Sequence, residues 1–347
     1  MSTQARVVRI QAAGGPEVLV LGQILVRDPG PTEVLVEVAA VGLNRADCLQ
    51  RKGVYPAPPG TIPDVPGLEY AGRVAKVGSE VRTRKVGDAV MAICAGGAYA
   101  THIVAHEREL VSVPDGMDLT QAAAIPEVFM TAYDALFLQA RLGMGQFALV
   151  HAIGSGIGTA ALQLVRAAGG FVIGTSRKSD KLERLKSLGL VHGIATAVGP
   201  RTDDPRPSTA PLFADRVREI TGGRLAHAVL DTVGASYLAE NIKAVAVGGT
   251  IVTIGMLGGA KAELPLGLLV GKRATLKGSV LRSRPLEEKV ALARAFTECV
   301  LPQFSPVGAE QPALRPIVED VMPMADAGKA HARMESDDLL GKLVLTW

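Results

Sequence analysis

Three glycines at alternate positions interrupt an apolar stretch and could present backbone N–H groups to a negatively charged ligand. Gly154, Gly156 and Gly158 follow the apolar run from Phe147 to Ala152, which is typical of a buried parallel strand. Apolar residues then recur at helical spacing as far as Gly169. A glycine turn between a strand and a helix places free N–H groups at the helix N-terminus, where a pyrophosphate can bind.

The glycine spacing departs from the regular G-x-G-x-x-G pattern, because Ile153, Ser155 and Thr159 occupy positions that the pattern gives to glycine. A tight turn without a ligand is the alternative interpretation. The segments that follow favour phosphate binding, because they alternate between strands and helices, as in a doubly wound parallel sheet. We expect strands over 171–175, 192–196, 226–231 and 250–255, and helices over 179–188, 212–221 and 237–247.

The end of the second of these strands indicates which dinucleotide binds. Sheets that bind NAD usually carry an acidic residue there, which holds the ribose hydroxyls. This chain instead has Ser176, Arg177 and Lys178, with Lys181 one turn further on. Hydroxyl and cationic groups can hold a 2′-phosphate through charge-assisted hydrogen bonds, although each cation could simply be solvated. The sequence therefore favours NADP(H) over NAD(H).

The rest of the 347-residue chain has a different pattern of apolar and polar residues. Short alternating runs broken by glycine and proline predict a small barrel-like β domain, and a proline-rich loop lies at 55–67. A helical pattern begins near Asp118 and continues to about residue 140. After residue 273 we expect a strand over 274–281, a helix over 285–301 and a last strand over 339–345, all returning to the first domain. The expected domains are 1–124, 125–270 and 271–347.

Composition excludes several classes of protein. Hydrophobic residues make up 48% of the chain and charged residues 20%, with a formal net charge of +3, which is too small to indicate nucleic-acid binding. The charge-free stretch between Arg141 and Arg166 is interpreted as the strand and helix above, not as a membrane span. Three scattered cysteines indicate a reducing compartment, the cytoplasm. The proline-dense connection 199–211 is expected to be a surface insertion.

Several phrases together resemble the medium-chain dehydrogenase/reductase superfamily over essentially the whole chain. They are Leu43-Asn-Arg-Ala-Asp47, Pro66-Gly-Leu-Glu-Tyr-Ala-Gly72, Val86-Gly-Asp88, Ala122-Ala-Ala-Ile-Pro-Glu127 and the 151–159 turn. The resemblance implies a GroES-like β-barrel-type catalytic domain with an inserted Rossmann domain. Zinc-dependent members have Cys and His where this chain has Asn44 and Leu68, which are not zinc ligands. No metal is expected.

The chain is most similar in these features to the zinc-free quinone oxidoreductase branch, in the subgroup that includes the tumour-suppressor-inducible quinone oxidoreductase. The phrases at 50–60, 125–127 and 281–284 carry that similarity. It implies that Asn44 and Tyr55 serve catalysis, with a quinone or an enone as substrate, and that the protein is a homodimer. It also implies a set of cofactor-binding residues, namely Asn44, Val128, Thr131, Ser155, Gly156, Ile157, Gly158, Ser176, Arg177, Lys178, Lys181, Gly255, Met256, Leu257, Val280 and Leu281.

Overall fold

A computed structural model describes residues 2–196, 213–305 and 313–347. The chain divides into two compact units. Unit 1 consists of Met1–Met130 together with Leu281–Trp347, and unit 2 is the intervening segment Thr131–Val280. The expected insertion at 199–211 lies outside the described residues.

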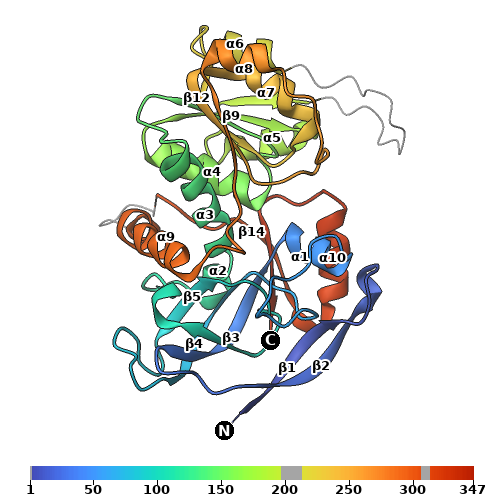
Figure 1. The fold of residues 1–347 in the computed structure, drawn as a ribbon, viewed down its shortest axis with the longest axis vertical. Coiled ribbons are helices and arrows are strands. Elements are labelled where there is room, and N and C mark those ends of the chain that lie inside the picture. The colour runs from blue at the N-terminus through green and yellow to red at the C-terminus, as the bar shows by residue number, and fades with distance from the viewer. Residues whose placement is uncertain (1, 197–212, 306–312) are drawn as a thin grey trace. The chain divides into compact units, whose positions relative to one another are not determined.

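Unit 2 is built on a six-stranded sheet in which every neighbouring pair is parallel (Figure 1). The strands are β8 (Phe147–Val150), β9 (Phe171–Ser176), β10 (His192–Ala195), β11 (Ala226–Asp231), β12 (Val245–Thr253) and β13 (Thr275–Gly278). Their order in space is β10-β9-β8-β11-β12-β13, which is the order of a dinucleotide-binding Rossmann sheet. The strand order reverses between β8 and β11, so a ligand crevice is expected at the carboxyl ends of these two strands.

Helices connect the strands of unit 2 because parallel neighbours need a crossover. They are α4 (Gly156–Ala167), α5 (Ser179–Lys186), α6 (Ala214–Ile220), α7 (Leu238–Ala244) and α8 (Leu266–Lys272), together with the π-helical segment Asp134–Gln139 and a short 3₁₀ turn, Ala235–Tyr237. The core between sheet and helices is formed by buried apolar side chains such as Leu149, Ile173, Phe213, Val229 and Ile251.

Unit 1 contains a seven-stranded sheet and a separate two-stranded one. In the larger sheet the order is β14-β15-β3-β4-β5-β7, and β6 pairs with β3. The strands are β1 (Thr3–Ile10), β2 (Leu19–Val26), β3 (Glu33–Leu43), β4 (Glu69–Val77), β5 (Ala89–Ile93), β6 (His102–His106), β7 (Val111–Ser112), β14 (Val318–Pro323) and β15 (Lys342–Thr346). The last strand of the chain therefore pairs antiparallel with β3, from the N-terminal part.

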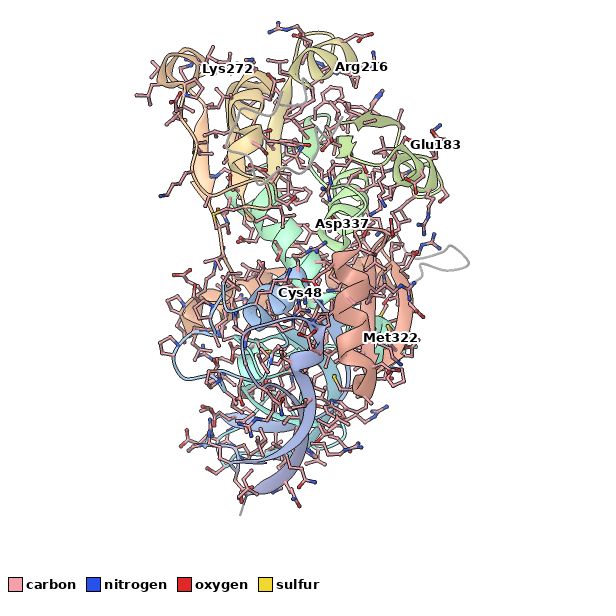
Figure 2. The ribbon with its side chains drawn as sticks, turned by 90° about the vertical axis from the view of Figure 1, so that its right-hand side faces the viewer. Cys48, Glu183, Arg216, Lys272, Met322 and Asp337 are labelled. Carbon is pink, nitrogen blue, oxygen red and sulfur yellow. The ribbon has the colours of Figure 1, made fainter. Side chains whose placement is uncertain are left out.

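The helices of unit 1 are α1 (Arg45–Arg51), α2 (Leu119–Ala122), α9 (Leu286–Cys299) and α10 (Ala327–Glu335), and α3 (Pro126–Tyr133) runs across the boundary with unit 2 in the sequence. Short 3₁₀ turns lie at 16–18, 107–109, 301–304 and 324–326. Cys48 lies on α1, and Asp337 follows α10 (Figure 2). Asp337 forms an ion pair of 2.5 Å with Arg45 at the start of α1, which joins two segments of unit 1 that are far apart in the sequence.

The predicted architecture, a GroES-like domain plus an inserted parallel sheet, is confirmed. One segment differs from the expectation. The strand expected at 274–281 was assigned to the first domain, but β13 is the sixth strand of the parallel sheet, paired with β12. Its residues are exposed, unlike those of the inner parallel strands. Its place in the parallel sheet follows only from its pairing with β12, and the sequence does not reveal that pairing. None of the described helices is both long and apolar enough to span a membrane.

Candidate active site

The glycine turn forms the N-terminus of α4, as its spacing predicts. Ser155 caps the helix, and its Oγ accepts a hydrogen bond of 3.1 Å from the backbone N–H of Gly158. No hydrogen bond joins the backbone N–H of Gly156 or Ile157 to another described residue. Two N–H groups at the positive end of a twelve-residue helix can therefore donate to a pyrophosphate.

Gly158 is required by packing and not by backbone conformation. A Cβ at this position would lie 2.4 Å from the carbonyl oxygen of Ile153 and 2.6 Å from its carbonyl carbon. The glycine thus allows α4 to approach the turn after β8 closely, which is the role of the third glycine in dinucleotide-binding turns. Ala152, in the same turn, adopts a left-handed conformation with φ of 49°. The residues present fit a dinucleotide pyrophosphate.

The end of β9 carries the polar residues that the sequence associates with a 2′-phosphate. The hydroxyl of Ser176 is buried and bridges the backbone of Lys178, because it accepts from the N–H at 3.1 Å and donates to the carbonyl oxygen at 2.9 Å. Arg177 and Lys178 are exposed, and Lys181 is half-buried on α5. The structure thus gathers the predicted residues at one strand end, next to the helix that follows.

Tyr237 was missed in the sequence and belongs to the same region of unit 2. Burial raises the pKa of its hydroxyl, whereas the neighbouring Thr196 side chain and the charge of Arg177 lower it. The tyrosine side chain packs against His151, with ring centroids 4.8 Å apart. It precedes α7 and is 60 residues from Arg177 in the chain, so no local pattern links it to β9.

The carboxyl ends of β11 and β12 provide apolar surface near the strand-order reversal. Asp231 ends β11, and its Oδ1 accepts from the N–H groups of Val233 and Gly234. Gly255 follows β12, and a Cβ there would lie 2.9 Å from the carbonyl oxygen of Thr232. The next two residues, Met256 and Leu257, are 63% and 59% exposed. Large exposed apolar side chains at such an edge are available to contact a ligand.

The remaining predicted cofactor residues lie near the two points in the sequence where the chain passes from one unit to the other. Thr131, in unit 2, is buried, and its Oγ1 has no hydrogen-bond partner among the described residues. Val128 is buried on the part of α3 that belongs to unit 1. Val280 is 47% exposed, whereas Leu281 is buried. A buried hydroxyl without a partner costs free energy, so the unpartnered Thr131 is consistent with a ligand that accepts or donates a hydrogen bond there.

A buried charge network in unit 1, which we define as Asn44, Asp47, Glu69 and Lys342, was not predicted as a group. The Lys342 ammonium donates to Glu69 Oε1 at 2.6 Å, to Asn44 Oδ1 at 2.7 Å and to the Leu43 carbonyl oxygen at 2.7 Å. An ammonium has three N–H donors, so all of them are used. The lysine is 3% exposed and Glu69 is fully buried. Each buried charge needs the opposite charge beside it to offset the cost of its removal from water.

Asn44 is engaged within this network. Its side-chain amide nitrogen donates to Glu69 Oε1 at 3.0 Å and to the Gly42 carbonyl oxygen at 3.1 Å. Gly42 makes room for the carboxylate, since a Cβ there would lie 2.3 Å from Glu69 Oε1. The predicted role of Asn44 as a hydrogen-bond donor to substrate stays a prediction. Both of its amide hydrogens already have protein acceptors.

Asp47 holds the loop before β4 against α1. Its two carboxylate oxygens accept from the N–H of Asn44 at 2.8 Å and from the N–H of Gly67 at 3.1 Å. Burial raises the pKa of Asp47 to about 6, although these hydrogen bonds and the charge of Lys342 act in the opposite direction. Two of the phrases that carry the family resemblance, at 43–47 and 66–72, are thereby joined in space.

Tyr55 is held by Arg282, which comes from the other part of unit 1. The guanidinium lies 5.0 Å from the centre of the Tyr55 ring, and it donates to the Ala95 carbonyl oxygen at 2.6 Å and to Gln50 Oε1. Cation–π stacking of this kind fixes the ring. Tyr55 is half-buried, and burial raises the pKa of its hydroxyl.

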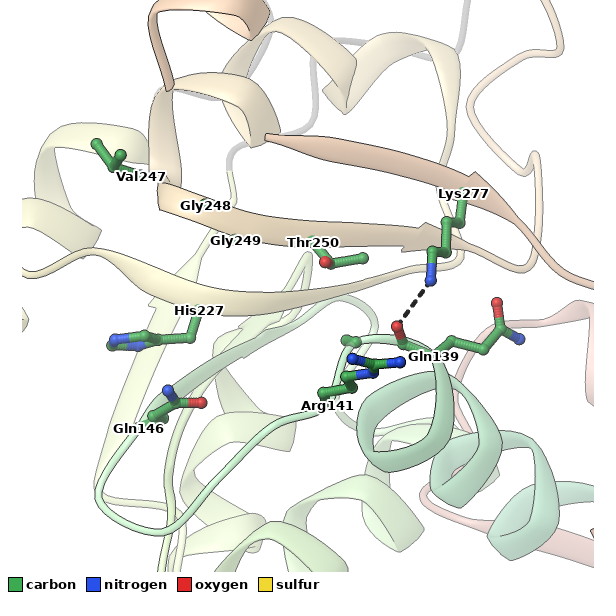
Figure 3. Close-up of a pocket in the computed structure, with 10 residues that line it drawn as sticks. Gln139, Arg141, Gln146, His227, Val247, Gly248, Gly249, Thr250 and Lys277 are labelled. Atoms are coloured by element: carbon green, nitrogen blue, oxygen red, sulfur yellow. Dashed lines mark hydrogen bonds between the residues drawn. The ribbon is translucent and has the colours of Figure 1, made fainter. Parts of the chain in front are cut away.

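A hollow of about 480 Å³ lies at the opposite end of the parallel sheet, near the amino ends of β8 and β11 (Figure 3). Lys277 crosses one side of it and donates to the Gln139 carbonyl oxygen at 2.9 Å. His227 and Gln146 line the other side. This hollow does not include any of the predicted site residues.

The described residues contain no group of three or more His, Cys, Asp or Glu side chains placed to hold a metal ion. Leu68 is buried, with 2% of its surface exposed. Asn44 is bound to Lys342 as described above. At the two positions where zinc-dependent members have ligands, this chain therefore has a hydrogen-bonded amide and a buried leucine, and neither is a usual zinc ligand.

Comparisons with known proteins agree with this geometry. Residues 30–115 match the family described as "Alcohol dehydrogenase GroES-like domain", and residues 156–297 match "Zinc-binding dehydrogenase". A quinone oxidoreductase from Pseudomonas aeruginosa is 33% identical over 98% of this chain and 99% of its own length. A quinone oxidoreductase structure from Pseudomonas syringae superimposes with a TM-score of 0.81 at 29% identity, covering 99% of this chain and all of that one.

A GroES-like domain interrupted by a Rossmann sheet with a glycine turn before its first helix defines a medium-chain dehydrogenase/reductase. Within that superfamily, the chain belongs to the quinone oxidoreductase branch. Membership carries oxidoreductase activity with a nicotinamide cofactor. One solved structure of similar fold is the JamJ enoyl reductase, with a TM-score of 0.83 and 25% identity over 99% of both chains.

Proposed function

We propose that the protein is an NADPH-dependent, metal-free quinone reductase that transfers a hydride to a small quinone acceptor. The observation that carries the proposal is the pair of unpartnered N–H groups of Gly156 and Ile157 on a Rossmann sheet in a chain of the quinone oxidoreductase branch. An enone double-bond reductase is the second candidate, and the similarity to an enoyl reductase structure favours it. Both candidates need the same apparatus and differ in the shape of the acceptor pocket.

In the proposed reaction the bound cofactor supplies the hydride, and the chain binds and orients. Ser155 to Gly158 would hold the pyrophosphate, while Met256 and Leu257 would cover the nicotinamide half. Tyr55, fixed by Arg282, would donate a hydrogen bond to the acceptor oxygen, where negative charge develops. Asn44 would act from within the buried charge network. Each amide hydrogen that it donated to the acceptor would have to leave its present acceptor, the Gly42 carbonyl oxygen or Glu69 Oε1.

The direct test is NADPH oxidation with 1,2-naphthoquinone and, in parallel, with a simple α,β-unsaturated aldehyde. Turnover of the quinone supports the first candidate. Turnover of the aldehyde alone would replace it with the second. Tight NADPH binding without turnover of either substrate would indicate a non-enzymatic NADPH-binding protein, since a fold does not guarantee an activity.

The preference for NADPH rests on the residues at the end of β9 and is tested by Arg177→Ala. We expect the variant to bind NADPH about ten- to a hundredfold more weakly, because a charge-assisted hydrogen bond to the 2′-phosphate contributes about 1.5–3 kcal/mol. NADH lacks that phosphate, and its affinity should change little. Titration calorimetry with both nucleotides measures the difference, and Arg184→Ala, on α5, is the control. Equal weakening of NADPH and NADH would contradict the assignment.

A homodimer is proposed from the exposed edge of unit 2. β13 has one strand neighbour, β12, among the described strands, and all four of its residues are exposed. The adjacent α8 buries none of its residues, and Val270 is 72% and Leu266 61% exposed. An open strand edge beside exposed apolar side chains invites aggregation, so a second copy of the chain is the occupant that would cover it.

Mass photometry of the wild type is expected to show a dimer, and Val270→Asp is expected to shift it to monomer by placing a charge in the apolar contact. Leu25→Asp is a matched control, because Leu25 in unit 1 is also 72% exposed. A wild type that is monomeric at micromolar concentration would contradict the proposed dimer.

We also propose that the protein works in the cytoplasm. Cys48, Cys94 and Cys299 are free of disulfide bonds in the structure, and free cysteines are typical of proteins in a reducing compartment.

A further inference from the structure

The hollow at the amino ends of β8 and β11 is lined by hydrogen-bond donors and by no acid among the described residues. Its volume of about 480 Å³ falls in the range of small-molecule sites, about 300–1,000 Å³. Lys277 and Arg141 lie on one side of it, and His227 and Gln146 on the other (Figure 3). All four belong to unit 2. A hollow with donors on two sides suits a ligand that accepts hydrogen bonds.

The two cations of the hollow have unused hydrogen-bond donors. The Lys277 ammonium donates to the Gln139 carbonyl oxygen, which uses one of its three N–H groups. The Arg141 guanidinium forms no hydrogen bond with the residues that the structure describes, and neither cation forms an ion pair with an acid there. Two like charges that line one hollow repel each other, so an anion placed between them lowers the free energy.

The two neutral donors are oriented by bonds to the backbone. His227 Nδ1 accepts from the Phe147 N–H at 3.3 Å, so the neutral ring carries its hydrogen on Nε2. Burial and the charge of Arg224 lower the pKa of His227, which keeps the ring neutral at pH 7. Gln146 Oε1 accepts from the Gly143 N–H at 2.8 Å, so the other end of this amide is its NH₂ donor. Both groups are therefore set to donate.

The backbone of Arg141 is strained. The residue follows the π-helical segment Asp134–Gln139 and Ala140, and its φ of 54° lies in the left-handed region. A side chain in this conformation costs free energy that glycine would not. Strain of this kind is concentrated at ligand-binding sites. Because the strained residue also carries a guanidinium without a partner among the described residues, its side chain is better explained by binding than by folding.

We propose that this hollow binds the phosphate group of a small phosphate monoester. We call it the amino-end site and define it as Arg141, Gln146, His227 and Lys277. It goes beyond the proposed reaction, because it lies at the opposite end of the sheet from the glycine turn and includes no residue assigned to cofactor or acceptor.

Phosphate fits the donors of the amino-end site better than a carboxylate does. A phosphate monoester has three terminal oxygens and a charge of about −1.5 to −2 at pH 7, which two cations and two neutral donors can match. A carboxylate has two oxygens and one charge. The guanidinium fork of Arg141 is suited to bind two phosphate oxygens at once. The hollow also includes Val247 and Ala140, which can contact the organic part of the ester.

The test is calorimetric titration of phenyl phosphate into protein saturated with NADPH, at an ionic strength of about 0.15 M. We expect wild type to bind one phenyl phosphate per chain. Arg141→Gln and Lys277→Gln should each weaken binding about ten- to a hundredfold, because each removes a charge-assisted hydrogen bond. Arg216→Gln loses the same charge at an exposed position on α6 and should bind as wild type does. No binding by wild type, or equal affinity in Arg141→Gln and Arg216→Gln, would overturn the proposal.

Two further titrations identify the ligand chemistry and the place where it binds. Benzoate, which has the same ring with a carboxylate, should bind wild type at least tenfold more weakly than phenyl phosphate; equal affinity would contradict the choice of phosphate. Removing NADPH should leave the affinity for phenyl phosphate unchanged. Binding that occurs only without NADPH and does not respond to Arg141→Gln would place the phosphate at the glycine turn and refute the amino-end site. A protein that binds phenyl phosphate at this site but reduces neither quinone nor enone would refute the proposed reaction alone.

The variant Arg141→Gly separates binding from folding. Glycine adopts the left-handed conformation without strain, whereas glutamine keeps the strain, and both lack the guanidinium. We therefore expect Arg141→Gly to unfold at a higher temperature than Arg141→Gln and to bind phenyl phosphate no better. Wild-type affinity in Arg141→Gly would show that the guanidinium does not contact the ligand, and the proposal would fail.

Discussion

Lys342→Met is expected to destabilise unit 1 by about 3–5 kcal/mol, because removing one partner of a buried ion pair leaves the other charge uncompensated. The lysine is 3% exposed and donates to three oxygens, one of them on the fully buried Glu69. Methionine has a similar length but no charge and no N–H donor. Thermal unfolding can be followed by the fluorescence of Trp347, which is the only tryptophan of the chain and directly follows β15 in unit 1.

The double variant Lys342→Met, Glu69→Gln distinguishes charge from packing. Removing the carboxylate charge as well should recover part of the lost stability, so the two substitutions are expected to be non-additive. Lys329→Met is the control, since Lys329 is a surface residue whose side chain is 77% exposed. A loss in Lys342→Met no larger than in the control would show that the buried network contributes little to folding.

Gly158→Ala is expected to weaken NADPH binding about tenfold or more and to destabilise unit 2 by about 1–3 kcal/mol. The added methyl group would lie 2.4 Å from the Ile153 carbonyl oxygen. Since that neighbour is backbone, either α4 or the turn after β8 has to move. The movement would displace the N–H groups of Gly156 and Ile157 from the phosphate. Fluorescence of bound NADPH measures the affinity.

Gly267→Ala is the matched control for this substitution. Gly267 lies on α8 in the same unit, and a Cβ there meets no atom within 4 Å. Alanine favours a helix over glycine by about 1 kcal/mol, so the control should bind NADPH as wild type does and should not be less stable. Equal NADPH affinity in both variants would contradict the role of Gly158 in shaping the turn.

The fold and the strand–turn–helix geometry of the glycine turn could be predicted because their signals are local. The run from Phe147 to Ala152, the glycines and the helical spacing after them lie within a single segment of the chain. The alternation of strands and helices after this segment is also visible in local sequence patterns, and it predicts the parallel sheet. β13 shows the limit of such signals, because an exposed edge strand has no apolar run and is identified only by the strand it pairs with.

The buried charge network could not be predicted, because its members are brought together by strand pairing. Lys342 and Glu69 are far apart in the sequence, and β15 reaches β4 only through their common neighbour, β3. Asn44 was predicted as a functional residue, whereas the structure shows which oxygens its amide already binds.

The position of Lys342 has a consequence for the order in which the protein is made. Glu69 leaves the ribosome long before Lys342, with all of unit 2 synthesised between them. At about 5–20 residues per second, that interval lasts from roughly ten seconds to a minute. During that time the N-terminal part of unit 1 holds an acid without its cation, whereas the sequence of unit 2 is complete before Lys342 is added. We therefore expect the nucleotide-binding unit to mature first on the ribosome, and the nascent β3 and β4 to depend on chaperones until β15 arrives.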